Sequence, residues 1–225
     1  GVSTRAMPGF RRLAELRGKR IGVSSPGSST NMVANMVLRR AGLTAADVSY
    51  VGVGTSAGAL QALRTGLIDV ISNVEPVMTA LEQKGEVKII SDTRTLNGTQ
   101  EAFGGPMPSG CLYAPAEFVQ KHPGTCQALA SGIVHALMWL RTAGPSDIIK
   151  TVPESYLLGD RGLYLAAFSK VREAFSLDGL MPEEGTRTAL RALSALDPAV
   201  RADRILLART FTNEFARRAK DRYRA

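Results

Sequence analysis

Apolar and polar positions follow two different periodicities over residues 19–92, and together they predict strands and helices in turn. Short apolar runs with the length of buried strands alternate with stretches in which apolar residues recur every three or four positions. The predicted strands are 19–24, 48–53, 70–72 and 87–90. The predicted helices are 29–41, 56–65 and 75–83, the first two followed by Gly42 and Gly66. This alternation predicts βαβ crossovers and a mainly parallel sheet with both faces covered.

The chain changes character after residue 92. Residues 93–110, TRTLNGTQEAFGGPMPSG, are rich in Thr, Gly and Pro and predict a long connection or hinge. Residues 111–114 predict one short strand, and nearly everything after Pro115 predicts helix. The predicted helices are 116–121, 125–142, 146–151, 160–175, 183–195 and 212–222. This part supplies many apolar helix faces and a single strand, so by itself it predicts an incomplete layer.

Composition and charge narrow the classes of function. The chain has 225 residues, of which 44% are hydrophobic and 21% charged, as in folded globular proteins. Lys or Arg interrupts every long apolar run, so no membrane-spanning helix is predicted. The formal net charge is +8, but the two small basic clusters, at 11–20 and 217–224, lack interleaved aromatic residues. They are typical of solvated faces, and no nucleic-acid partner is expected.

The residues that usually carry catalysis or metal binding form no recognisable arrangement. Cys111 and Cys126 have neither CxxC spacing nor a neighbouring histidine cluster, so no zinc site is expected. Each cysteine is either a small buried apolar residue or, in an oxidising compartment, one half of a disulfide. The sequence contains no GxSxG nucleophile motif for which His122 or His135 could act as the base. Packed or surface positions are favoured for both histidines. The sequence therefore predicts neither an enzyme nor a cofactor.

The segment RIGVSSPGSSTNMVANMVLRRAG, residues 20–42, carries the main candidate site. Its loop joins a predicted parallel strand to a helix, where the first backbone N–H groups point outward unpaired and carry partial positive charge. Gly27 permits close approach of a ligand to the backbone, and hydroxyl and amide groups surround it. They belong to Ser24, Ser25, Ser28, Ser29, Thr30 and Asn31. The loop predicts a cradle for sulfonate, carboxylate, nitrate or phosphate, the alternative being a serine-rich turn with an ordinary helix cap.

Two other loops follow predicted strands of the same sheet. GVGTSAG, residues 52–58, imitates a dinucleotide-binding fingerprint, but its third glycine comes one position late. The first loop, for its part, lacks the lysine of the Walker A motif, which argues against triphosphate binding. Asn73 and Glu75 open a helix directly after a strand, so Glu75 is either a ligand contact or a charge that favours the start of the helix.

These segments resemble a known family. LAELRGKRIGVSSPGSSTNMVANMVLRRAGL, VGVGTSAGALQALRTGLIDVISNVEPVMTALEQ and CLYAPAEFVQKHPGTCQALASGIVHALMWL are similar to the substrate-binding proteins of ABC importers in the nitrate/sulfonate/taurine, thiamine-precursor-like group. The resemblance spans most of residues 10–145. It implies a type II periplasmic-binding-protein architecture in which two α/β lobes enclose a small anionic ligand in a cleft. The implied partner is a transporter permease in the membrane, and the implied location is periplasmic or extracellular and membrane-associated.

Carried onto this chain, the resemblance implies three sets of ligand contacts. They are Ser25, Gly27, Ser28, Ser29 and Thr30 in the first loop, Thr55 in the second, and Asn73 and Glu75 in the third. The implied organisation is a crossover segment at 1–12, a complete parallel-sheet α/β lobe at 13–92, a hinge at 93–110, and a helix-rich partial second lobe at 111–225. No signal peptide is recognisable at the N-terminus.

One departure from the family affects the expected function. The family begins with a βαβ section that here would precede Gly1, so we expect half of the ligand site to be missing and the apolar faces of the later helices to promote self-association. Three alternatives use the same fold: a regulatory effector domain, an interaction module that has lost its ligand, and an enzyme like the pyrimidine synthase of thiamine biosynthesis. The expected DNA-reading helices, reactive histidine and Cys-rich motif are not recognisable in the sequence.

Overall fold

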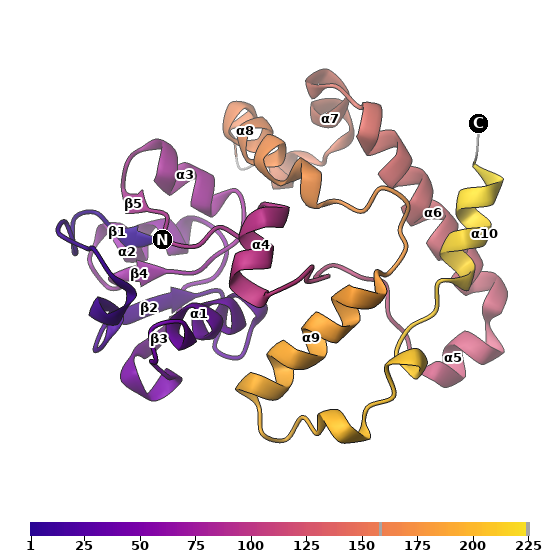
Figure 1. Ribbon diagram of the computed structural model, residues 1–225. Helices are drawn as coiled ribbons and strands as arrows, with labels where there is room; N and C mark the ends of the chain where they lie inside the picture. Colours follow the sequence, from indigo (N-terminus) through magenta and orange to yellow (C-terminus); the bar gives the residue numbers. More distant parts are fainter. Residues whose placement is uncertain (158, 224–225) are drawn as a thin grey trace. The chain divides into compact units, whose positions relative to one another are not determined.

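The computed structural model describes residues 1–157 and 159–223 and divides into two compact units (Figure 1). Unit 1 contains residues 1–102 and 154–171, and unit 2 contains 103–153 and the residues from 172 onward. Arg224, the last residue of the predicted C-terminal basic cluster, lies outside the described residues. The predicted lobe and hinge boundaries at 12, 92 and 110 stay a prediction. None of the described helices combines the length and apolar character needed to cross a bilayer.

A five-stranded mixed sheet forms the centre of unit 1, with the order β3-β2-β4-β1-β5. The strands are β1 (Val2–Ser3), β2 (Arg20–Val23), β3 (Ser49–Gly52), β4 (Val70–Ile71) and β5 (Val87–Lys88). β2 pairs in parallel with β3 and β4, as the βαβ pattern predicts. β1 was not predicted as a strand, yet it lies antiparallel between β4 and β5 through Val2 and Ser3.

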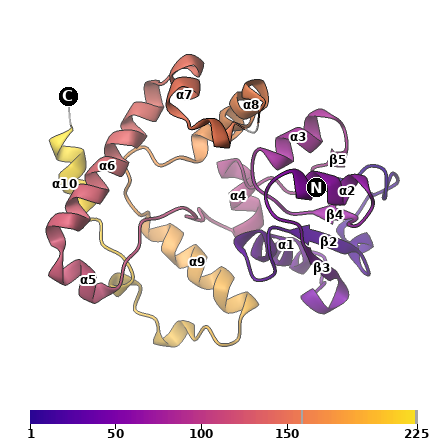
Figure 2. The ribbon, with the colours of Figure 1, turned by 180° about the vertical axis from the view of Figure 1, so that it is seen from behind.

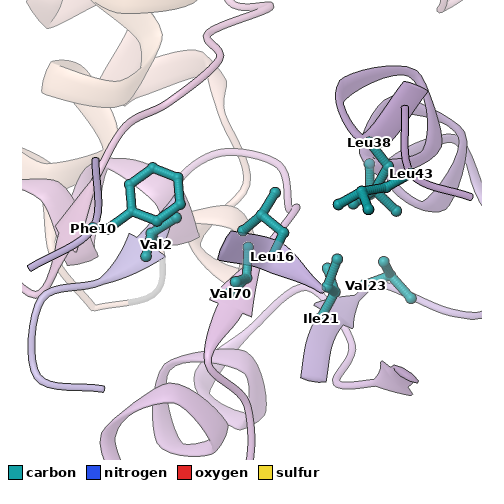
Figure 3. Packing of buried hydrophobic residues seen from close by; sticks show 9 residues of the cluster. Val2, Phe10, Leu16, Ile21, Val23, Leu38, Leu43 and Val70 are labelled. Carbon is teal, nitrogen blue, oxygen red and sulfur yellow. The ribbon is translucent and has the colours of Figure 1, made fainter. Parts of the chain in front are cut away.

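Helices cover both faces of this sheet, which confirms the predicted α/β class. α1 (Ser29–Arg39) packs on one face in a core that includes Val2, Ile21 and Leu38 (Figure 3). α2 (Ala57–Arg64) and α3 (Val77–Gln83) belong to the core on the other face. The alternation of side chains along a strand explains the division, because adjacent residues of β4, Val70 and Ile71, contribute to opposite cores. Unit 1 also contains α8 (Arg161–Val171).

Local sequence explains why α1 begins and ends where it does. Ser28 precedes the helix in an extended conformation, and its Oγ accepts the N–H of Asn31 at 3.3 Å. At the other end the N–H of Leu43 returns to the carbonyl of Leu38 at 3.0 Å, with Gly42 between them at φ +69°. The predicted helix at 29–41 is therefore confirmed within two residues of its C-terminal end.

The described residues of unit 2 form helices without a strand. The helices are α5 (Ala116–Lys121), α6 (Pro123–Thr142), α7 (Pro145–Thr151), α9 (Glu183–Leu196) and α10 (Glu214–Arg222). α10 packs along α6, as Figure 2 shows. The rings of Tyr223 and His135 are stacked with their centroids 4.7 Å apart. The helix-rich character of this part of the chain is as predicted.

The structure differs from the predictions at two places in residues 93–114. The predicted connection or hinge at 93–110 contains a helix that was not predicted, α4 (Leu96–Phe103), and Thr95 caps its start by accepting the N–H of Gly98 at 3.0 Å. Residues 111–114 form no strand and are exposed, since the described part of unit 2 offers no second strand for them to pair with.

The two cysteines are free, so the disulfide alternative is not realised in this structure. Cys126 is buried on α6, as expected for a small apolar residue. Cys111 is exposed, and the expectation of burial is wrong for it because it lies in the segment that lacks strand partners.

Candidate ligand-binding site

The connections of the sheet place a crevice at the carboxyl ends of β2 and β4. The chain leaves β2 through α1 toward β3 at one edge, and it leaves β4 through α3 toward β5 at the opposite edge. Two neighbouring parallel strands whose connections run in opposite directions define a switch point, where α/β proteins usually bind ligands. The first loop, residues 24–28, and the third loop, residues 72–76, both begin at this point.

Side chains within the first loop hold its backbone in place. The Oγ1 of Thr30 accepts the N–H of Ser24 at 2.9 Å and lies 2.8 Å from the Oγ of Ser28. The Oδ1 of Asn31 accepts the N–H of Gly27 at 2.9 Å. Thr30 and Asn31 are buried, with 5% and 9% exposure. The Thr30 side chain therefore holds the loop backbone from its buried side. A direct contact between Thr30 and a ligand stays a prediction.

The exposed side of the same loop presents unpaired backbone donors. Within the described part of the chain, the N–H groups of Ser29 and Thr30 have no protein acceptor. The first turn of α1 contains no acidic residue, so nothing on the helix offsets the partial positive charge at its N-terminus. Ser25, Gly27 and Ser29 are exposed, and Gly27 has φ +80° with open space where a Cβ would stand. This arrangement suits an anion that approaches the backbone closely.

Hydrogen bonds join the three loops to one another. The N–H of Gly54 donates to the carbonyl of Ser24 at 3.1 Å, which links the second loop to the first. The Nδ2 of Asn73 donates to the carbonyl of Gly54 at 2.9 Å, and the Oγ of Ser72 donates to the carbonyl of Thr30 at 2.7 Å. The structure thus brings the three predicted loops together at one edge of the sheet.

Two predicted contacts lie in the second and third loops. Thr55 is exposed in the second loop, just before α2. Asn73 is engaged at both ends of its amide, because its Oδ1 also accepts the N–H of Val74 at 2.9 Å. A direct role of either side chain in ligand binding stays a prediction.

Glu75 is held by partners that the sequence analysis did not anticipate. Its Oε1 accepts Nη1 of Arg94 at 2.8 Å, and its Oε2 accepts the N–H of Thr79 at 3.0 Å. Only 13% of each charged side chain of this ion pair is exposed. Both carboxylate oxygens are therefore occupied by protein groups, and ligand contact through Glu75 stays a prediction.

Arg94 is the centre of a larger ionic network. It donates to Asp92 at 2.6 and 2.8 Å and to Glu82 at 3.1 Å, and Glu82 also pairs with Lys170 of α8. The hydrogen bond from Arg94 lowers the pKa of Asp92, and the bond from Lys170 lowers the pKa of Glu82. Asp92, followed by Glu75, raises the pKa of Arg94. Three carboxylates face two cations, so the network has a net charge of about −1 at neutral pH.

Sequence reasoning missed Arg94 although a signal was present. The residue follows β5, the predicted last strand of the lobe, at the sheet edge where the other loops also lie. Of its three acidic partners, Glu75 and Glu82 are distant in sequence and only Asp92 is near, so the pairing itself leaves no local pattern. Among the described residues, no group of three or more His, Cys, Asp or Glu is placed to hold a metal ion.

A cavity of about 80 Å³ lies within unit 1 beside these loops. Val33, Ala34 and Val37 of α1 form part of its apolar wall. Its polar lining is Ser72, Asn73, Ser91, Asp92, Thr93 and Arg94. The volume is sufficient for several water molecules or for a small group of a ligand. The cavity and the hydrogen-bonded loops share Ser72 and Asn73, which makes them neighbouring parts of one region.

Comparison with known proteins supports the same interpretation of the fold. Residues 7–152 match the NMT1-like family. The chain belongs to this family. A comparison with curated proteins finds no match. The solved structure of a protein from Bordetella bronchiseptica RB50 is 52% identical, with a TM-score of 0.94, and the match covers 100% of this chain and 71% of that one.

Two more distant structures share the fold of this NMT1-like chain. A putative periplasmic sulfonate-binding protein SsuA from Methylobacillus flagellatus KT is 19% identical with a TM-score of 0.64, covering 98% of this chain and 64% of that one. The periplasmic aliphatic sulphonate-binding protein SsuA from Escherichia coli is 16% identical with a TM-score of 0.63, covering 96% and 68%. The chain thus spans about two thirds of these proteins. The predicted fold is confirmed.

Proposed function

We propose that this chain is the solute-binding component of an ABC importer and that unit 1 binds a small anion at the first turn of α1. The observation that carries the proposal is the pair of unpartnered N–H groups of Ser29 and Thr30 at the switch point of the sheet. The candidate ligands are a sulfonate, a nitrate, a carboxylate or a thiamine-precursor-like compound. The proposed role is binding and delivery without catalysis.

The proposed partner and location follow from the family and from the names of the structural neighbours. Two neighbours are described as periplasmic sulfonate-binding proteins, one of them as part of a putative ABC transporter. By analogy, we propose that the chain works in the periplasm and delivers its ligand to a membrane permease. A sulfonate is accordingly the first ligand to test.

Self-association is a separate part of the proposal. Large apolar side chains are exposed in unit 2, with 88% exposure for Tyr113, 67% for Leu177 and 65% for Leu206. Exposed apolar groups of this size favour association with a second apolar surface. Analytical ultracentrifugation is expected to show dimers or larger species at micromolar concentration, and a stable monomer would contradict this part.

A single backbone donor provides the sharpest test of the anion site. Ser29→Pro removes the N–H of the first helical residue, a position where proline is favourable. Ser28 has φ −73° and ψ 171°, the extended conformation that a residue before proline prefers. The substitution therefore removes one ligand donor while leaving α1 intact.

Titration calorimetry with methanesulfonate, nitrate, acetate and inorganic phosphate measures the effect. A hydrogen bond to a charged group contributes roughly 1.5–3 kcal/mol, so Ser29→Pro is expected to weaken anion binding by about 10- to 100-fold. Ser29→Ala keeps the N–H and is expected to weaken binding by less than about three-fold.

A matched proline controls for general effects of the substitution. Ala116 is the first residue of α5 in unit 2, and it follows Pro115 with φ −55° and ψ 142°. Ala116→Pro is expected to leave binding unchanged. Wild-type affinity in the Ser29→Pro protein would exclude the α1 site, and failure of every anion to bind the wild type would overturn the proposed function for this chain.

A further inference from the structure

Helix α8 occupies an unusual place along the chain. It belongs to unit 1, but the residues on both sides of its segment, 103–153 and those from 172 onward, belong to unit 2. Within unit 1, α8 packs against α3, and Leu157 and Ala167 of its segment are buried with 1% and 3% exposure. Any change in the docking of α8 on unit 1 therefore acts on two of the three points where the chain passes between the units, 153/154 and 171/172.

A continuous series of shared atoms connects α8 to the third loop. Lys170 and Arg94 both donate to Oε2 of Glu82, the bond from Arg94 coming from Nη1 at 3.1 Å. The same Nη1 donates to Oε1 of Glu75 at 2.8 Å. Glu75 lies two residues after Asn73, whose amide holds the third loop to the second.

The charges of this series make its members dependent on one another. Asp92 accepts from two side-chain nitrogens of Arg94, Nε and Nη2, so Glu75 and Glu82 share the remaining Nη1. Lys170 supplies the second cation. Without it, three carboxylates would face one guanidinium, and Glu82 would draw Nη1 away from Glu75 because it would have no other cation nearby.

We propose that Lys170, Glu82, Arg94 and Glu75 form an ionic relay that couples ligand binding at the loops to the docking of α8 on unit 1. Docked α8 holds Glu75 and the third loop in the geometry that receives the ligand, and ligand binding strengthens the docking of α8 in return. Glu75 and Arg94 thus act as positioning residues. This inference rests on the proposed function. It adds a route by which ligand binding at the loops affects the points where the chain passes from one unit to the other.

The first arm of the test needs no ligand. Glu75→Gln changes the loop end of the relay, and hydrogen–deuterium exchange of the whole chain is measured at residues 161–171. Faster exchange in α8, with unchanged exchange in α1 and α2, supports the relay because the substitution lies on a different element. Unchanged exchange in α8 would overturn the relay whether or not any ligand has been found.

The second arm uses binding of methanesulfonate. Lys170→Met is expected to weaken it by about five-fold or more, the usual range of coupling between sites. Arg161→Met is the matched control, since Arg161 is also on α8 but pairs with exposed Glu154 outside the relay. Equal affinity of Lys170→Met and wild type would overturn the relay and leave the proposed function intact. Absence of binding to the wild type would instead refute the proposed function, and the exchange measurement would still decide the relay.

Discussion

Replacing Arg94 by methionine tests whether the ionic network stabilises unit 1. Methionine keeps much of the length and apolar character of the arginine stem but removes every side-chain hydrogen bond to the three carboxylates; the backbone N–H of residue 94 still donates to Asp92. Glu82 retains Lys170, whereas Glu75 and Asp92 lose the cation that faces them. The variant therefore leaves partly buried negative charges without their counterion.

The expected cost follows from the burial of each partner. Removing one member of a fully buried ion pair destabilises a protein by roughly 3–5 kcal/mol. Glu75 is close to that limit at 13% exposure, but Asp92 and Glu82 are 34% and 35% exposed and are partly screened by water. We expect Arg94→Met to lower the free energy of unfolding by about 2–4 kcal/mol at pH 7. Arg94→Lys keeps a charge but loses the forked geometry, so its cost is expected to be intermediate.

The effect of the substitution must depend on pH in a defined direction. The pKa values of Asp92 and Glu82 are lowered in the folded protein, so each carboxylate contributes stability that is fully present above its ordinary pKa, near 4. This contribution is lost as the pH falls through the lowered folded pKa. The difference between wild type and Arg94→Met is therefore largest at neutral pH and shrinks below about pH 4.

Urea unfolding followed by circular dichroism, repeated from pH 7 to pH 3, measures both the size and the trend. Arg201→Met, which removes an exposed pair with Asp203, is the control and is expected to cost less than about 0.5 kcal/mol. A cost below about 0.5 kcal/mol for Arg94→Met at pH 7 would refute the reasoning. So would a cost that stays constant down to pH 3, because the carboxylates would then have no part in it.

Two further predictions concern packing and cysteine reactivity. Gly22→Ala places a Cβ 2.4 Å from the Cδ1 of buried Ile68, and we expect this overpacking to cost about 1–3 kcal/mol; an unchanged melting temperature would contradict it. Cys111 is exposed and Cys126 is buried, so a thiol reagent is expected to modify one cysteine in the native chain and two in denaturant, counted by mass spectrometry. Native modification of neither cysteine would contradict the exposure of Cys111.

Much of unit 1 is predictable because its signals are local. Ser28 and Gly42 bracket α1 as a cap and a left-handed glycine, and the apolar positions between them recur at helical spacing. The strands β2 to β5 follow the predicted runs for the same reason. In contrast, β1 has only Val2 and Ser3, too few residues to show a period, and its pairing with residues 70 and 87–88 is wholly non-local.

The position of the site was predictable from the sequence, but the contacts that each side chain makes were not. The strand-to-helix order places the three loops at one sheet edge, and hydrogen bonds from Ser72 and Asn73 bring them together. The partners of Glu75 depend on Arg94, nineteen residues away in the sequence on a different loop. An ion pair of this kind depends on tertiary packing, so a carboxylate beside a predicted site cannot be assigned to a ligand from its sequence position alone.

The antiparallel position of β1 governs the order in which unit 1 is able to form during synthesis. β1 separates β4 from β5, so it fills the gap between two strands that are translated about seventy and eighty-five residues after it. Lys170 and the rest of α8 emerge later still, after residues 103–153 of the other unit. Contacts so distant along the chain slow folding. The nascent polypeptide is therefore expected to expose the surface of α3 on which α8 packs until α8 has left the ribosome.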